Sequence, residues 1–450
     1  MAMEYTERKI DNTLLEWKNE KDRKPLLLRG ARQVGKTSAV RHLAESFEYY
    51  IEIDFLSSDN SDIAALFSQS ISTKELCQKI AVIKGIPLEE GKTLLFLDEI
   101  QSCPKAIEKL RYFYEQIPNL HLIAAGSLLE FALEELPSFG VGRIRSVFMY
   151  PLSFEEFLTF QNLNALRDEM NNASPRKPLD EIFHKKLLQE FRNFLILGGM
   201  PEVDSYWCET HDFLKCRQIQ NDLLISYNDD FSKYKKRIPA SRIQEVFRSV
   251  AIQGQGKFVY KKANPDLRTD QIKSALETLI LAGLVYPVTH TCANGIPLGA
   301  ELREDYKRMI YFDTGLLQRQ LNLKAEDILV SDDFDVINKG AIAETFVGTE
   351  LMKAGSFYEK NELYCWHRED AGSNAEVDYV IQNGSEIIPI EVKASKKGSM
   401  QSLRRFLALK GKPYGIRTSL ENFCEYDDIK VYPLYAIKNA REIGSKPSPR

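Results

Sequence analysis

The chain has 450 residues, of which 44% are hydrophobic and 28% are charged, and its formal net charge is −4. A chain of this length typically folds into about three domains, and the composition is that of an ordinary soluble globular protein. The near-neutral charge excludes attraction of the whole chain to nucleic acid, so any such contact must come from local basic patches.

The sequence carries no targeting or membrane signal. No apolar run approaches the ~20 residues that a membrane-spanning helix needs, and Met1–Asn19 is charged and lacks the apolar core of a signal peptide. The seven cysteines are scattered without a C-x-x-C pair, so we interpret them as free thiols and not as zinc ligands or disulfides. These features predict a cytoplasmic protein without a membrane partner.

The most informative stretch is a glycine-rich turn near the N-terminus. Leu26–Leu28 predicts a short buried strand, and the residues after Thr37 predict a helix. Between them, Gly30-Ala-Arg-Gln-Val-Gly35-Lys36-Thr37 matches the G-x-x-x-x-G-K-[ST] phosphate loop. The two glycines let the backbone curl around a phosphate. Lys36 places a charge on the β/γ-phosphates and the Thr37 hydroxyl can ligate Mg²⁺, so the motif predicts ATP and Mg²⁺ as cofactors.

Two further strands end in polar residues. The apolar run Thr93–Leu97 is followed by Asp98 and Glu99, and carboxylates at the C-terminal end of a parallel strand lie where open α/β sheets bind ligands. We expect Asp98 to hold Mg²⁺ through water and Glu99 to polarise the attacking water. The run Leu120–Ala125 is followed by glycine and Ser127. The Ser127 hydroxyl reads the γ-phosphate, or this pair is an ordinary Gly-Ser turn.

Strand and helix patterns alternate from residue 25 to about residue 150, which predicts a parallel sheet with helices on both faces. Arg143 and Arg145 lie on a strand-like run at the end of this region. One of them, for which we select Arg143, could reach a γ-phosphate in its own subunit or in a neighbouring subunit of a homo-oligomer. The alternative is that both are surface arginines with solvated contacts.

The middle of the chain is predicted to be mainly helical. A basic cluster follows the first helices, and it is either a solvated face or a binding patch. Its members are Lys233, Lys235, Lys236, Arg237 and, shortly after, Arg242. Residues 241–290 then show the order helix, helix, short strand of a winged helix-turn-helix. Such a module reads DNA or packs between domains. The cations available to a phosphate backbone are Lys261, Lys262, Arg268 and Lys273.

A second chemical signal lies in residues 335–440. An amphipathic helix carries Glu344, the first strand of a predicted hairpin carries Asp378, and the second strand ends in Glu391-Val-Lys393. Glu391 and Lys393 point to one face because side chains alternate along a strand. Three carboxylates brought together in this way form a hard oxygen site for Mg²⁺, where Lys393 would orient a nucleophile or stabilise charge on phosphate. The alternative is a solvent-facing hairpin with Glu–Lys pairs across the strands.

The N-terminal motifs together resemble a known family. The phosphate loop, the strand ending in Asp98-Glu99, the Ala-Gly-Ser127 turn and the run Tyr150-Pro-Leu-Ser-Phe-Glu-Glu-Phe157 are similar to P-loop ATPases of the AAA+ superfamily. The similarity is to a prokaryotic branch whose members are predicted ATPases. It implies an ATP-binding α/β domain with Mg²⁺-dependent hydrolysis.

The C-terminal part resembles the usual companion of that branch, a domain of unknown function with a restriction-endonuclease-like PD-(D/E)XK core. The resemblance implies that Glu344 is the helix acid, Asp378 the first strand acid, and Glu391 with Lys393 the E-x-K element. Val377 stands where the name of the motif has proline. All four functional positions match the pattern, so the core is not visibly inactivated.

We therefore predict an α/β protein in three parts: a P-loop ATPase domain with a parallel sheet over residues 1–160, a helical and winged-helix region over 161–330, and a nuclease-like α/β domain over 331–450. Two functions compete. In the first, the ATP state gates a metal-dependent nuclease that acts on DNA or RNA. In the second, the ATPase is a regulatory switch, and the C-terminal domain only binds nucleic acid or a partner protein. The intact acid set favours the first function, and the near-neutral charge favours the second.

Overall fold

The computed structural model describes residues 5–135, 142–234, 238–323, 339–368, 375–395 and 399–442. The chain divides into two compact units, one formed by Met1–Tyr150 with Ser356–Lys360 and the other by Pro151–Gly355 with Asn361–Arg450. Lys235, Lys236 and Arg237 of the basic cluster, and the start of the predicted third domain, lie outside the described residues. None of the helices in the described ranges has both the length and the apolar character that crossing a bilayer requires.

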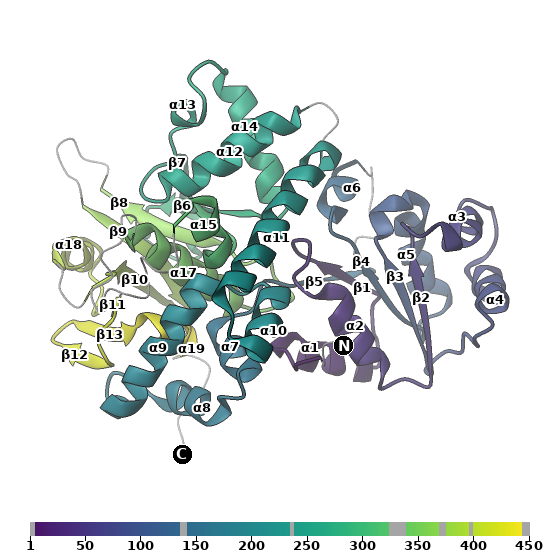
Figure 1. Ribbon diagram of the computed structural model, residues 1–450, viewed down its shortest axis with the longest axis horizontal. Coiled ribbons are helices and arrows are strands. Elements are labelled where there is room, and N and C mark those ends of the chain that lie inside the picture. Colours follow the sequence, from purple (N-terminus) through teal and green to yellow (C-terminus); the bar gives the residue numbers. More distant parts are fainter. Residues whose placement is uncertain are drawn as a thin grey trace. The chain divides into compact units, whose positions relative to one another are not determined.

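The first unit is built on a five-stranded sheet in the order β2-β3-β4-β1-β5 (Figure 1). All four neighbouring pairs are parallel, so the predicted parallel sheet is confirmed. Every residue of β3 and β4 is buried, as is typical of strands covered by helices on both faces. The strands are β1 Leu26–Arg29, β2 Tyr49–Asp54, β3 Thr93–Asp98, β4 His121–Ala125 and β5 Arg145–Phe148.

Helices connect these strands because a parallel pair needs a crossover. Residues of α3, α4 and α5 pack with strand residues such as Leu95 and Leu97 in one apolar core. On α1, Leu14 and Trp17 are fully buried. The helices of this unit are α1 Lys9–Asn19, α2 Lys36–Ala44, α3 Ser61–Phe67, α4 Thr73–Lys84, α5 Pro104–Gln116 and α6 Leu129–Glu135.

The second unit begins with a capped helix, α7 (Phe154–Phe160). The Ser153 side chain accepts a hydrogen bond from Glu156 N, and Ser153 N donates to Glu156 Oε2 at 2.8 Å, which together form a capping box. The helices that follow are α8 Asn164–Asn172, α9 Glu181–Leu197, α10 Pro201–Thr210, α11 Phe213–Tyr234, α12 Ala240–Gln253, α13 Tyr260–Ala263, α14 Thr269–Leu281, α15 Thr314–Gln320, α17 Lys339–Lys353, α18 Gln401–Lys410 and α19 Asn439–Glu442.

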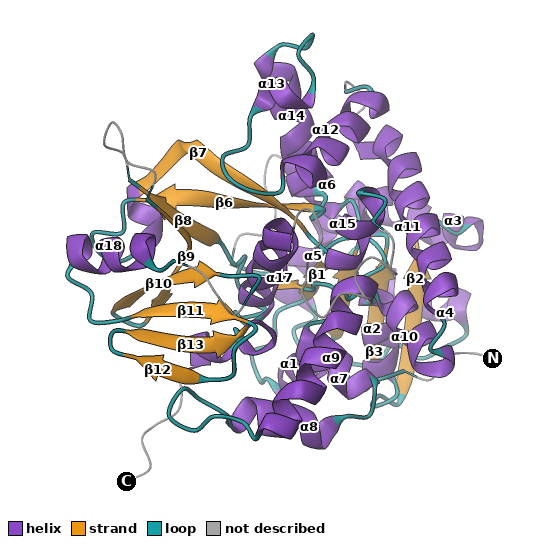
Figure 2. Cartoon of the chain, turned by 60° about the vertical axis from the view of Figure 1, so that its left-hand side comes forward, coloured by secondary structure: helices purple, strands orange, loops and turns teal. Residues whose placement is uncertain are grey.

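An eight-stranded mixed sheet organises this unit, in the order β12-β13-β11-β10-β9-β8-β6-β7. Figure 2 shows the strands following one another in this order from β7 at the top to β12 at the bottom. Helix α18 packs on β9, β10 and β11, while α17 packs on β7, β8 and β10. The strands are β6 Val285–Thr291, β7 Leu302–Tyr311, β8 Leu363–His367, β9 Glu376–Asn383, β10 Glu386–Val392, β11 Gly415–Ser419, β12 Cys424–Tyr426 and β13 Ile429–Pro433.

The structure differs from the predicted division into three domains. The first boundary falls at Tyr150 and Pro151, before the expected position at residue 160. The expected boundary at residue 330 does not separate two folding units, because β6 pairs in parallel with β8, with Val288 opposite Leu363. A strand at the edge of a hairpin has unpaired backbone groups and tends to pair with another strand. Here β6 is that edge strand, and its partner β8 comes from the C-terminal part of the chain.

The order α12, α13, α14, β6, β7 is the order expected for a winged helix. Its hairpin extends the larger sheet, and Phe247 of α12 stacks on Tyr311 of β7 with ring centroids 4.5 Å apart. The stack holds the module together internally, and the pairing of β6 with β8 makes packing against the C-terminal strands one role of the module. Whether it also contacts DNA stays a prediction.

Candidate functional site

The phosphate loop is held open by backbone conformations that glycine adopts readily. Gly30 has φ 144° and Gly35 has φ 95°, and Gln33 between them also has a positive φ of 61°. A Cβ on Gly30 would lie 2.1 Å from the carbonyl oxygen of Met149, so no side chain fits there. Gly35 is the residue before α2, and the loop therefore presents the N-terminus of that helix toward a bound anion.

Lys36 lies inside this loop and is almost fully buried, with 8% exposure. Its ammonium donates hydrogen bonds to the carbonyl oxygens of Gly30 at 2.9 Å and Ala31 at 2.7 Å. Burial lowers the pKa of Lys36 to about 8, against the opposing effect of Glu99 and Asp98. The charge is thus held beside the glycines, where the motif requires it.

Thr37 and Asp98 meet across the site. The Thr37 hydroxyl donates to Asp98 Oδ2 at 2.8 Å, and Asp98 Oδ1 accepts from Glu99 N at 2.9 Å. Burial raises the pKa of Asp98, while the hydrogen bonds from Thr37 and Glu99 N lower it. A hydroxyl and a carboxylate in contact are hard oxygen donors, so these residues fit Mg²⁺.

Glu99 follows β3 in a left-handed conformation with φ 49°. Its Oε2 accepts hydrogen bonds from Ser127 Oγ at 3.2 Å and from the amide of Gln101. Ser127 therefore contacts the predicted catalytic acid, and its reading of a γ-phosphate stays a prediction. Our reading of the sequence missed Gln101, for which the Glu-x-Gln spacing after the strand was the available signal. A Cβ on Gly126 would lie 2.0 Å from Gln101 Oε1, so this glycine leaves room for that side chain.

Arg8 also supports the phosphate loop, a role that the sequence did not predict. Its guanidinium donates to the carbonyl oxygen of Val34 at 2.8 Å and to that of Tyr150 at 3.0 Å. Arg8 is 6% exposed, and Asp11 Oδ2 accepts from Arg8 N at 2.6 Å. These contacts fix the segment before α1 against the phosphate loop, so Arg8 is a positioning residue.

The structure corrects the role of Arg143 and Arg145 within their own subunit. Arg145 is paired with Leu26, the first residue of β1, and the two strands are parallel. The phosphate loop follows the other end of β1, about 10 Å away along the strand. Arg143 pairs instead with Glu115, and Arg145 with Glu20 at 2.6 Å. Neither arginine can act on a phosphate in its own loop, and only the role in a neighbouring subunit stays a prediction.

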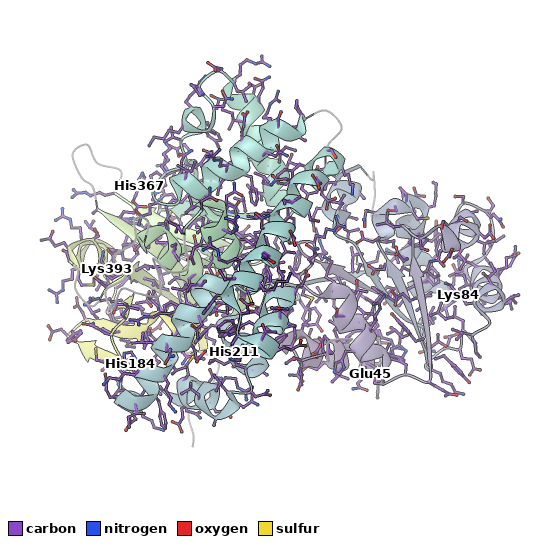
Figure 3. All side chains as sticks on the ribbon, viewed as in Figure 1. Glu45, Lys84, His184, His211, His367 and Lys393 are labelled. Atoms are coloured by element: carbon purple, nitrogen blue, oxygen red, sulfur yellow. The ribbon has the colours of Figure 1, made fainter. Side chains whose placement is uncertain are left out.

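In the second unit, the predicted hairpin β9–β10 brings the C-terminal acids together. Tyr379 is opposite Ile390, so the same register continued by one residue sets Asp378 opposite Glu391. Asp378 Oδ2 accepts from Val392 N at 2.7 Å, and Glu391 Oε1 accepts from Lys393 Nζ at 2.7 Å. Figure 3 labels Lys393 on this sheet.

The centre of this acid cluster is a residue that the motif does not contain. Arg308 of β7 is 3% exposed, and its Nη1 lies 2.5 Å from Glu344 Oε2 and 3.5 Å from Asp378 Oδ1. Its Nη2 donates to the carbonyl oxygen of Asp378, and its Nε lies 3.9 Å from Glu376 Oε1. Glu344, Glu376 and Asp378 thus surround a buried guanidinium. Together with Glu391, which is opposite Asp378, they form what we call the acid cluster.

Burial dominates the ionisation of these acids. It raises the pKa of Glu344 to about 8 and that of Glu391 to about 7, and it also raises the pKa of Asp378. Arg308 opposes this effect on Glu344 and Asp378, and Lys393 opposes it on Glu391. Asp378 adds repulsion to both neighbouring glutamates. The cluster therefore combines unfavourable burial of negative charge with two internal cations.

The acid cluster does not fit the predicted metal site as it stands. Among the residues that the structure describes, no group of three or more His, Cys, Asp or Glu side chains could hold a metal ion. Glu344 is directed to Arg308 and to Gln255 Nε2, which donates to Glu344 Oε1 at 3.1 Å. Protein cations and donors take up most of these oxygens, so this arrangement does not support joint ligation of Mg²⁺ by Glu344, Asp378 and Glu391, which stays a prediction.

Comparison with known families gives three matches along the chain. Residues 22–158 match the family described as AAA domain. Residues 188–327 and 339–437 match two domains of unknown function, DUF8612 and DUF4143. Together with the geometry of the phosphate loop, the first match makes the N-terminal unit an AAA-type P-loop ATPase domain.

Relatives across the whole chain are distant. The uncharacterized protein MJ1544 of Methanocaldococcus jannaschii is 23% identical over 364 residues, which cover 78% of this chain and 70% of that protein. The Walker-type ATPase PABY2304 of Pyrococcus abyssi is 15% identical with a TM-score of 0.45, over 70% of this chain and 96% of that one. The Orc1 protein of Aeropyrum pernix, solved in complex with DNA, is 14% identical with a TM-score of 0.30, over 74% and 94%. Both structural likenesses are too weak to bear on function.

Proposed function

We propose that this protein binds ATP and hydrolyses it with Mg²⁺. The observation that carries the proposal is the meeting of Lys36, the Thr37–Asp98 pair and Glu99 at the carboxyl ends of β1 and β3. Lys36 and the loop amides bind the phosphates. Thr37 and Asp98 would hold Mg²⁺, which offsets phosphate charge. Glu99, oriented by Ser127 and Gln101, takes a proton from the attacking water. Measuring phosphate release from ATP with and without Mg²⁺ tests the proposal, and no release with Mg²⁺ would overturn it.

The lowered pKa of Lys36 predicts a pH dependence of ATP binding. With a pKa of about 8, Lys36 is charged below pH 8 and becomes neutral above it. Bound phosphates favour the charged form and raise this pKa, so affinity should be constant below pH 8 and fall above it, by at most about tenfold per pH unit. Measuring the dissociation constant for ATP at intervals from pH 7 to pH 10 would show this loss of affinity. In Lys36→Arg, whose side chain stays charged, the same range should leave the affinity flat.

We further propose that Arg143 acts on ATP bound to a neighbouring copy of the chain. Its position at the amino-terminal edge of the sheet leaves it exposed to another subunit and away from its own loop. Specific ATPase activity should then rise with protein concentration and be lowered by Arg143→Ala. Concentration-independent activity of a protein that light scattering shows to be monomeric with ATP would contradict this role.

The second unit, we propose, binds nucleic acid through a basic groove between α12 and α13. The groove has a volume of about 650 Å³, and its cationic lining residues are Arg248, Lys257 and Lys262. One acid, Glu245, also lines it, so its charge balance favours an anionic ligand. Gln255 lines the groove and donates to Glu344. A phosphate backbone in this groove would therefore lie next to the acid cluster.

Charge reversal in the groove tests this interaction. Arg248→Glu with Lys257→Glu should weaken binding of labelled DNA and RNA oligonucleotides at least about tenfold and lower the slope of log affinity against log salt. The exposed Lys186 on α9 provides the control, and Lys186→Glu should change neither quantity. If both variants lost the same affinity, the loss would come from the change in net charge, and the groove would not be the binding site.

The chain path supports coupling between ATP state and the second unit. Residues Ser356–Lys360 belong to the ATPase unit although they connect α17, which carries Glu344, directly to β8. Phe148 N of β5 donates to the carbonyl oxygen of Phe357 at 2.8 Å, and the Arg145 guanidinium lies 5.2 Å from the Tyr358 ring centroid. A change at β5 would thus be transmitted along the chain to the helix of the acid cluster. Affinity of the oligonucleotides with and without ATP tests this coupling.

A metal-dependent nuclease gated by ATP is the second candidate. The observation in its favour is the convergence of Glu344, Asp378, Glu391 and Lys393, the four positions of the nuclease-like motif. Incubation with DNA and RNA, with and without ATP and Mg²⁺ or Mn²⁺, distinguishes the candidates. Binding without cleavage would leave the groove proposal in place and remove the nuclease.

A further inference from the structure

The acid cluster of the second unit already contains a cation. Arg308 enters it from β7, is 3% exposed, and faces Glu344, Asp378 and Glu376 at the distances given above. Its guanidinium also lies over the Tyr379 ring, 5.2 Å from the centroid. A guanidinium remains charged at any ordinary pH, so this cation does not leave the site by losing a proton.

The oxygens that a metal would need are almost all engaged by protein groups. Arg308 Nη1 and Gln255 Nε2 each contact one oxygen of Glu344. Asp378 lies between Arg308 and Val392 N, and Lys393 takes Glu391 Oε1. Of the six carboxylate oxygens on Glu344, Asp378 and Glu391, only Glu391 Oε2 is buried without a hydrogen-bond partner. Asp378 Oδ1 also has no hydrogen bond to any residue that the structure describes, and it lies 3.5 Å from Arg308 Nη1. These two oxygens do not make a divalent-cation site, which requires several oxygen ligands at once.

We infer that Arg308 is the resident cation of the acid cluster, and that a divalent metal binds these carboxylates only when the guanidinium is removed. The reason is geometric as well as electrostatic. The Nη1 atom lies between the carboxylates of Glu344 and Asp378, where a shared metal would have to lie, and two cations in one buried position repel each other. The inference does not rest on ATP hydrolysis, and it holds whether or not the groove binds nucleic acid.

This assignment gives the second unit a metal-free resting state. The cluster is a partly compensated ionic network that joins β7, α17 and β9. The first of these strands lies before residue 330, and the helix and the second strand lie after it. Metal-dependent chemistry would require the Arg308 guanidinium to leave the cluster first. This means either a movement of β7 or a change in the rotamer of the Arg308 side chain. The presence of the four motif residues is therefore not sufficient for nuclease activity.

The experiment is a titration of the full chain with Mn²⁺ in the absence of nucleotide, followed by electron paramagnetic resonance of the free ion. Four proteins are compared: the parent, Asp378→Asn, Arg308→Met and the double variant. We expect the parent and Asp378→Asn to bind the same amount of Mn²⁺, because the cluster holds none. Arg308→Met should bind one further equivalent, and the double variant should lose it.

Two results would overturn the inference. The first is Mn²⁺ binding by the parent that disappears in Asp378→Asn, since the guanidinium would then tolerate a metal. The second is an Arg308→Met protein that folds, as judged by circular dichroism, and gains no Mn²⁺. If Arg308→Met does not fold, the comparison of the parent with Asp378→Asn decides alone: equal binding supports the inference, and a difference refutes it.

Discussion

Replacing Glu99 with Gln should lower the rate of ATP hydrolysis about a hundredfold while leaving ATP binding intact. The amide cannot take a proton from water, and loss of a transition-state group of this kind typically costs ~3 kcal/mol. The neighbouring contacts with Ser127 and Gln101 can be made by an amide oxygen as well, so the site should keep its shape. Steady-state phosphate release and equilibrium binding of a fluorescent ATP analogue measure the two quantities.

Lys36→Ala provides the contrasting variant. It removes the buried charge beside Gly30 and Ala31, so binding itself should be lost and with it all turnover. Glu90→Gln is the matched control, because Glu90 is exposed and precedes β3, and its activity should equal that of the parent. Hydrolysis by Glu99→Gln at the parent rate would mean that another group activates the water.

Replacing Arg308 with Met should destabilise the second unit by about 3–5 kcal/mol in the absence of divalent metal. Removing one partner of a buried ionic network leaves the remaining charges uncompensated. Here the charges left behind are those of Glu344, Asp378 and Glu376. The raised pKa of Glu344 allows it to take up a proton, which places the expected loss toward the lower end of this range near neutral pH.

Urea unfolding followed by tryptophan fluorescence measures this loss. Of the three tryptophans, Trp17 belongs to the first unit, and Trp207 and Trp366 to the second, so a Trp17→Phe background reports on the second unit alone. Arg303→Met is the control, since Arg303 is an exposed arginine on the same strand, and a surface change of this kind should stay within about 0.5 kcal/mol. Equal destabilisation by both variants would show that Arg308 contributes no more to stability than an exposed arginine of the same strand.

The sequence alone determined the parts of the protein whose conformation is local. The phosphate loop is encoded by eight consecutive residues, and its glycines, Lys36 and Thr37 take the conformations and contacts that the motif requires. The strand ending in Asp98 and the hairpin that carries Asp378 and Glu391 were likewise predicted, because side-chain alternation and turn residues act over short distances. The family matches confirm the AAA-type ATPase domain and leave the nuclease-like assignment of the C-terminal part as a hypothesis.

Only the tertiary structure decided which distant residues complete these sites. Arg8 reaches a carbonyl 142 positions away, and Arg308 lies 36 and 70 positions from Glu344 and Asp378. No spacing rule connects residues so far apart, because their contact depends on the order of strands in the sheet. The order and direction of the strands also place Arg143 away from its own phosphate loop. In the second unit, strand order pairs β6 with β8 across the expected domain boundary. Local chemistry therefore predicted the ATP site, while long-range strand pairing placed a cation inside the acid cluster that the motif had assigned to a metal.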